Sequence, residues 1–160
     1  MLFVVAWPLL SEGDELALRR LRAQYHPREA GLIGPHFTLV FGAPADREPA
    51  LRTALATIER RPFWFLIDRI ARHDLHLYAE PSDGGAELVA LHETLNPMLG
   101  GEPFEPHITL GVFGHAIQAE QIARIVERQH LPIHGRVEEL SLLKREGDRL
   151  DTLATVRLGA

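Results

Sequence analysis

The spacing of hydrophobic and polar positions predicts a chain in which strands alternate with helices. Short runs rich in Val, Ile, Leu, Phe and Thr, bounded by Gly, Pro or Asp, are typical of strands, and apolar positions three or four apart are typical of helices. The predicted strands are residues 2–7, 35–42, 63–70, 75–79, 106–114, 138–144 and 150–157. The predicted helices run from the N-cap Ser11 to before Pro27, from Pro49 to about Arg60, over residues 87–98, where Gly100 and Gly101 end the helix, and over residues 119–129.

Two of these strands are near copies of each other. The first contains Pro35-His36-Phe37-Thr38-Leu39 and the second contains Pro106-His107-Ile108-Thr109-Leu110. His36 and His107 are separated by roughly half of the 160-residue chain, and the order of strand, helix, motif strand, helix and hairpin recurs approximately around them. The sequence therefore predicts a duplicated half-domain that brings two equivalent His-Thr pairs into one site.

The alternation of side chains along a strand separates each motif into two faces. His36 and Thr38 share one face, whereas Phe37, Leu39 and Phe41 share the face expected to pack in the core. The second motif follows the same rule. An imidazole and a hydroxyl therefore stand side by side, twice, on faces that can meet across a site.

Two imidazoles and two hydroxyls suit displacement at a phosphodiester. Histidine titrates near pH 6.5, so that one ring can accept a proton while the other donates one. Threonine hydroxyls can donate hydrogen bonds to an anion, and phosphoryl chemistry depends largely on positioning and charge stabilisation. No metal or other cofactor is expected, because two His and two Thr do not supply the three protein ligands and open position of a catalytic zinc site.

The doubled His-x-Thr-Leu motif resembles the 2H phosphoesterase superfamily, in particular its 2'-5' RNA ligase-like and RNA 2',3'-cyclic phosphodiesterase branch. The resemblance covers nearly the whole chain. It implies an α+β fold, bilobal and pseudo-two-fold, with antiparallel sheets, helices outside and a central cleft, in one domain of two lobes over residues 1–160. It also implies catalytic roles for His36 and His107 and phosphate-binding roles for Thr38 and Thr109.

The function implied is a metal-independent hydrolase that opens 2',3'-cyclic phosphates of RNA ends or small nucleotides, and hence a role in RNA processing. Two alternatives stay open: 2'-5' RNA ligation, which is the same chemistry run backwards, and a noncatalytic module that binds nucleotides or RNA ends. Many members of the RNA-directed branch carry a basic residue soon after the second Leu, where this chain has Gly111 and Val112. This departure bears on polynucleotide binding rather than on the chemistry.

Aromatic and basic residues near the motifs are candidates to bind the rest of a substrate. Tyr78 and Phe113 are candidates to stack on a base, since Phe113 shares the His107 face by its parity. The candidates to hold a terminal phosphate are Arg69, Lys144 and Arg145.

The other histidines are expected to be structural or solvated. His73 and His76 are predicted to face opposite ways on a strand, which argues against shared metal ligation. His92 on a predicted helix and His115 beyond the second motif carry no pattern that indicates chemistry.

Composition limits the partners. The formal net charge of −5 gives no overall attraction to phosphate backbones, so long duplex nucleic acid is not an expected partner. There is no cysteine, which excludes disulfides and thiolate metal sites. The apolar residues 1–10 lack the basic segment and cleavage site of a signal peptide, and no run approaches the length of a membrane helix. We expect a cytoplasmic monomer without a membrane partner.

Overall fold

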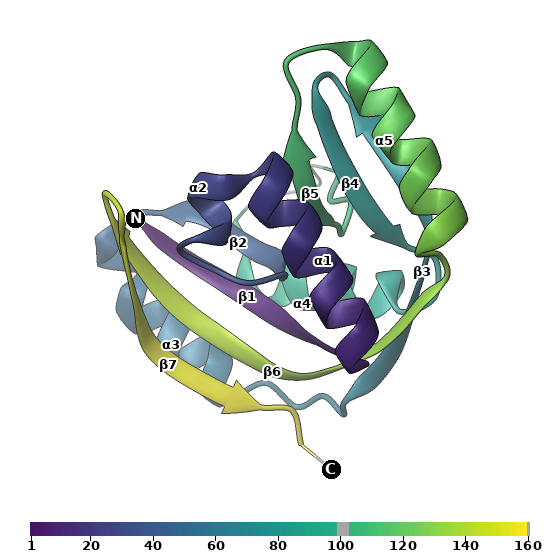
Figure 1. Ribbon diagram of the computed structural model, residues 1–160. Coiled ribbons are helices and arrows are strands. Elements are labelled where there is room, and N and C mark those ends of the chain that lie inside the picture. Colours follow the sequence, from purple (N-terminus) through teal and green to yellow (C-terminus); the bar gives the residue numbers. More distant parts are fainter. Residues whose placement is uncertain (99–102, 160) are drawn as a thin grey trace.

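The computed structural model describes residues 1–98 and 103–159 and shows a mixed fold of helices and antiparallel strands (Figure 1). The strands are β1 (Leu2–Leu10), β2 (Phe37–Ala43), β3 (Phe63–His73), β4 (His76–Pro81), β5 (Ile108–Val112), β6 (Ile133–Glu146) and β7 (Arg149–Arg157). The helices are α1 (Glu12–Tyr25), α2 (Pro27–Ala30), α3 (Glu48–Ala56), α4 (Gly85–Leu95) and α5 (Ala116–Gln129), with a 3-10 turn η1 (Ala45–Arg47).

The predicted order of the strands and of the four longer helices is confirmed, with shifted ends, whereas α2 and η1 were not predicted. The first helix begins as expected, because the Ser11 hydroxyl accepts a hydrogen bond from the Asp14 amide at 3.2 Å. Helix α3 has Pro49 in its first turn but ends at Ala56, before the predicted Arg60. The predicted helix break at Gly100 and Gly101 lies outside the described residues.

All seven strands form one open antiparallel sheet, and the two motif strands lie at opposite ends of it. The strand order is β2-β1-β6-β3-β4-β5, with β7 paired beside β6. The long strand β6 joins the two ends, since its first residues pair with β3 and its later residues pair with β7, while β1 follows most of its length. Figure 1 shows β3, β4 and β5 together on one side of the molecule, with β1, β2, β6 and β7 on the other.

The chain repeats one unit twice and exchanges a helix between the two copies. The order β1-α1-β2-α3-β3 matches the order β4-α4-β5-α5-β6. Helix α1 of the first unit packs on β5 of the second, and α4 of the second packs on β2 of the first. Each motif strand is therefore supported by a helix from the other half, and the predicted duplicated α+β fold is confirmed.

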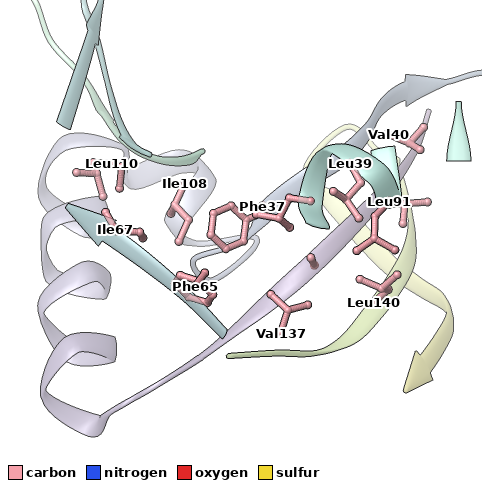
Figure 2. Packing of buried hydrophobic residues seen from close by; sticks show 14 of the residues in the cluster. Phe37, Leu39, Val40, Phe65, Ile67, Leu91, Ile108, Leu110, Val137 and Leu140 are labelled. Carbon is pink, nitrogen blue, oxygen red and sulfur yellow. The ribbon is translucent and has the colours of Figure 1, made fainter. Parts of the chain in front are cut away.

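The apolar faces of both motif strands meet in one hydrophobic core (Figure 2). Phe37 of β2 is fully buried and meets Phe65 of β3 edge-on, with ring centroids 5.2 Å apart. Ile108 and Leu110 of β5 belong to the same cluster. Burying a side chain of this size stabilises the fold by roughly 1.5–3 kcal/mol, so the core fixes the motif strands firmly.

Among the described residues, no helix combines the length and apolar character needed to cross a membrane.

Candidate active site

Both His-Thr pairs line a single cavity of about 540 Å³. His36 and Thr38 enter it from the start of β2, and His107 and Thr109 enter it from the start of β5. The predicted convergence of the two motifs is thus present in the structure. Tyr78 of β4, a predicted base-stacking residue, lines the same cavity.

The two imidazole rings are held in the same way. The Nδ1–H of His36 donates to the Gly34 carbonyl oxygen at 2.8 Å, and the Nδ1–H of His107 donates to the Glu105 carbonyl oxygen at 2.8 Å. A carbonyl can only accept, so each Nδ1 carries a proton and Nε2 is the atom that is left to accept or donate one.

A proline stands between each histidine and the carbonyl that holds it. Pro35 separates Gly34 from His36, and Pro106 separates Glu105 from His107. Proline fixes its own φ and restricts the residue before it. The repeated proline in the motif therefore sets the direction of the carbonyl that selects the imidazole tautomer.

His36 is the more deeply buried of the two rings. Burial disfavours the charged form and lowers the pKa of His36 from 6.5 to about 4, although the hydrogen bond to Gly34 opposes the shift. The positive charge of Arg22 lowers this pKa further. The Trp7 ring lies edge-on to the imidazole, with centroids 6.4 Å apart. His36 is therefore neutral at physiological pH.

His107 has a more exposed and more acidic environment. Burial is again the largest cause and lowers its pKa below 6.5, whereas the Glu105 hydrogen bond and the charge of Glu80 raise it. The ring stacks on Tyr78 with centroids 3.9 Å apart and an interplanar angle of 23°. His107 is thus easier to protonate than His36.

The two threonine hydroxyls face the cavity without an internal partner. Thr38 is paired across the sheet with Val5, and Thr109 with Tyr78. Within residues 1–98 and 103–159, neither hydroxyl makes a hydrogen bond to protein. Each hydroxyl is therefore available to donate to an anion bound between the histidines.

A further residue of the site lies outside both motifs: Arg22 follows Leu18 by four positions on the buried side of α1. The Arg22 side chain is only 2% exposed and lines the cavity. Its Nε donates to the Thr109 carbonyl at 3.2 Å, and its Nη1 donates to the Ile33 carbonyl at 2.7 Å. An arginine on the apolar stripe of a helix is a sequence signal for such a buried, specific role.

Helix α1 and strand β5 approach closely at Gly111. A Cβ atom added there would lie 2.5 Å from the Cβ of Tyr25, so a larger residue would push the helix away. The same contact places Arg22 beside Thr109. Gly111 is therefore required by the packing of α1 on β5, whereas Val112 beside it is exposed.

The base-stacking prediction for Phe113 is wrong. Phe113 is 4% exposed, packs against Tyr25 with ring centroids 4.9 Å apart, and belongs to the core rather than to the cavity lining. The register between β4 and β5 shifts between Leu77 and Tyr78, so that both Leu110 and Gly111 are buried. This irregularity reverses the parity beyond Thr109 and turns Phe113 away from His107.

The core prediction for Phe41 is wrong for the same reason. Phe41 is 83% exposed, lines the cavity, and meets Phe3 edge-on at 5.4 Å. Two register shifts between β1 and β2 bury Leu39 and Val40 in succession and direct Phe41 to the opposite face. Phe41 and Phe3 therefore line the cavity, a position for Phe41 that strict alternation along β2 does not predict.

The prediction that His73 and His76 face opposite ways is wrong. They are direct cross-strand partners at the hairpin between β3 and β4, because the chain reverses at Asp74 and Leu75. Both rings lie near Tyr78, at 5.5 and 5.9 Å between centroids. Even so, residues 1–98 and 103–159 contain no group of three or more His, Cys, Asp or Glu arranged to hold a metal ion.

The three basic residues predicted as candidates to bind a terminal phosphate do not all lie at the cavity. Arg145 lines the cavity, where it pairs with Glu29 at 2.9 Å. Arg69 pairs with Glu80, and Lys144 pairs with Glu146, and neither lines the cavity.

His92 and His115 occupy the structural and solvated positions expected for them, whereas His26 and His76 line the cavity. The Nδ1–H of His92 donates to the Leu39 carbonyl at 2.8 Å and its ring stacks on Phe104, which is a structural role. His115 is exposed at the N-cap of α5.

A family model matches residues 10–149, which include both motifs, and its description is the 2'-5' RNA ligase superfamily. The chain belongs to this superfamily. The resemblance to 2H phosphoesterases is thereby confirmed. A search of curated protein sequences gave no match.

Solved structures share the fold over almost their entire length. Escherichia coli LigT complexed with ATP is 22% identical with a TM-score of 0.68, covering 99% of this chain and 98% of that one. A structure described as a phosphoesterase is 21% identical with a TM-score of 0.67, at 99% and 98% coverage. Kluyveromyces marxianus Usb1 is 11% identical with a TM-score of 0.51, at 95% and 96% coverage. At these identities the likeness establishes the fold.

Proposed function

We propose that this chain is a cyclic phosphodiesterase that hydrolyses 2',3'-cyclic phosphates of RNA ends or small nucleotides by general acid and base catalysis. The observation that carries the proposal is the pair of imidazoles in one cavity. Both hold their Nδ1 proton on a backbone carbonyl, and each is accompanied by a threonine hydroxyl.

The different surroundings of the two rings divide the roles between them. The Nε2 of His36 takes a proton from the attacking water, because burial keeps this ring neutral. The Nε2 of His107 donates a proton to the departing ribose oxygen; burial lowers the pKa of this ring, but the carbonyl of Glu105 and the charge of Glu80 oppose that shift. The bond between water oxygen and phosphorus forms as the bond to the ribose oxygen breaks, in line. The product is a nucleoside monophosphate.

The threonines complete the site by binding the phosphate. Thr38 and Thr109 donate to its two nonbridging oxygens, which carry the negative charge throughout the reaction. Removal of one preorganised donor of this kind costs roughly 10²–10³ in rate in other enzymes.

The cavity lining favours a nucleotide as the substrate. Phe41 and Tyr78 offer ring faces on which any base can stack. Structures of E. coli LigT have been determined with ATP and with 3'-AMP, which supports a nucleotide ligand for a chain of the same fold. The negative net charge of the chain favours a short RNA end or a small nucleotide over a long duplex.

A second candidate function is 2'-5' RNA ligation, favoured by the description of the matched family. A ribose hydroxyl of a second RNA end would take the place of water: His36 takes its proton as the new bond to phosphorus forms, and His107 donates a proton to the ribose oxygen of the cyclic phosphate as the old bond breaks. A noncatalytic binding module is the third candidate. It would need neither imidazole to be held in a defined tautomer.

Hydrolysis of a nucleoside 2',3'-cyclic phosphate in excess chelator tests the proposal. The native chain should turn over the substrate, and His36→Ala and His107→Ala should each slow turnover by about 10³-fold, while His115→Ala at an exposed position should leave it intact. Identification of the product as a 2'- or 3'-monophosphate shows which oxygen leaves. Loss of native activity in chelator, with recovery on addition of zinc, would contradict the proposal. Nucleotide binding without turnover would favour the binding module.

A further inference from the structure

Among the described residues that line it, the cavity has one positive charge in excess. Its lining includes three residues with a full charge at neutral pH: Arg22, Glu29 and Arg145. Arg145 donates to both carboxylate oxygens of Glu29, at 2.9 and 3.1 Å, so these two charges offset each other. Among residues 1–98 and 103–159, no carboxylate forms an ion pair with Arg22. The site therefore has a local charge opposite in sign to that of the whole chain.

A buried arginine without an acidic partner is costly. Arg22 is 2% exposed, and desolvation lowers the pKa of its guanidinium. Removing an ion from water costs several kcal/mol unless a counter-charge or a full set of hydrogen bonds compensates. The carbonyl oxygens of Thr109 and Ile33 accept hydrogen bonds from Nε–H and from one N–H of Nη1. The guanidinium has five N–H groups, and the others make no hydrogen bond to the described residues. An anion in the cavity would supply the missing counter-charge.

The two carbonyls that hold Arg22 belong to the two motif segments. Ile33 lies three residues before His36, and Thr109 is itself the second motif threonine. The guanidinium therefore sits between the two halves of the site, where the phosphate must lie to be reached by both imidazoles. The Arg22 guanidinium is planar and rigid, which limits the directions in which its remaining N–H groups can donate.

We propose that Arg22 is a phosphate-binding residue, whose remaining guanidinium N–H groups donate to a nonbridging oxygen of the substrate phosphate bound between the two motifs. The inference rests on the proposed function for the identity of the substrate, but the binding of phosphate itself is independent of turnover. Arg22 thereby joins Thr38 and Thr109 as a third donor for the anion, and it brings a positive charge to the site.

Binding of inorganic phosphate, measured by titration calorimetry on the full chain, tests this role. Arg22→Met keeps the apolar stem and removes the charge, and it should weaken phosphate affinity by roughly 10- to 100-fold, as expected for hydrogen bonds that involve a charge. Arg20→Met, at an exposed position two residues earlier on α1, is the matched control and should bind like the native chain. An unchanged dissociation constant in a folded Arg22→Met would overturn the proposal.

A purely structural role predicts a different result. It would lower the melting temperature of Arg22→Met but leave its phosphate-induced rise in melting temperature equal to that of the native chain. We expect that rise to be largely lost in Arg22→Met. The loss would stand even if the native chain fails to hydrolyse cyclic phosphates, in which case the phosphate site is retained and the proposed function alone fails.

A measurement on the native chain covers the case in which Arg22→Met does not fold. The side-chain nitrogen resonances of Arg22, assigned by NMR through their loss in Arg22→Lys, should shift on titration with phosphate and saturate with the calorimetric affinity. Resonances of Arg20 should stay in place. No shift of the Arg22 resonances at saturating phosphate would overturn the proposal.

Discussion

The two halves of the site have the same backbone geometry but different surroundings. In each half a carbonyl two residues upstream holds Nδ1, and the hydroxyl of a threonine follows the imidazole. His36 is enclosed beside Trp7 and Arg22, whereas His107 is more open and stacks on Tyr78 near two carboxylates. Duplication thus supplies two equivalent imidazoles, and the neighbours of each ring make them unequal. That inequality is what an acid and base pair requires.

The largest expected effect comes from removing either imidazole. His36→Ala and His107→Ala should each lower kcat/KM for a nucleoside 2',3'-cyclic phosphate by about 10³-fold, within the range of general acid and base catalysis. The double variant should be little slower than either single one, because groups that act as a unit are not additive. Steady-state kinetics on the three variants checks this. Multiplicative losses would show that the two halves act independently.

The second prediction uses protein stability to compare the two rings. His36 binds a proton near pH 6.5 when unfolded and only near pH 4 when folded, so the unfolded state holds more protons in between. Stability should therefore fall as the pH drops from about 6.5 to about 4, by at most about 3 kcal/mol from this group. Urea unfolding against pH measures the slope.

The matched variants for this slope are His36→Asn and His107→Asn, in which an amide N–H can still reach the upstream carbonyl. His36→Asn should remove the larger part of the slope, because His36 is the more deeply buried ring. Equal losses in both variants would mean that the two environments are equivalent.

The third prediction concerns the threonines, where the two halves should behave alike. Thr38→Val and Thr109→Val keep the shape of the side chain and remove the hydroxyl donor, so each should lower kcat by about 10²-fold. Thr94→Val, at an exposed position of α4, is the control and should be unaffected. A loss confined to one threonine would assign the phosphate to one half of the site.

The smallest effect is expected from removing the Tyr78 ring, which stacks on His107 in the second half of the site. Tyr78→Leu removes the stack on His107, which is worth roughly 0.5–1.5 kcal/mol for aromatic pairs. A rise in KM and a fall in kcat of a few-fold each are the expected results, since the same ring also faces the substrate. Unchanged kinetics would place Tyr78 outside the working site.

The hydrophobic pattern was sufficient to predict the strands and the longer helices, and the repeated motifs were sufficient to predict the duplication and the placement of His36 and His107 in one cavity. Parity arguments failed at Phe41 and Phe113, because β-bulges reverse the alternation and bulges leave no clear signal in a single sequence. Arg22 was missed because its role depends on α1 crossing to β5 in the other half. The packing of α1 on β5 follows from the exchange of helices between the two halves, and the spacing of apolar residues along one helix does not predict that exchange.

The division of labour between the two rings is tested most directly with a nucleoside 2',3'-cyclic phosphate in which sulfur replaces the ribose oxygen that leaves. A thiolate departs without a proton, so the variant that lacks the general acid should recover on this substrate. We predict that His107→Ala hydrolyses it within about tenfold of the native rate, while His36→Ala remains slow. Recovery of His36→Ala instead, or of neither variant, would contradict the assignment of His36 as base and His107 as acid.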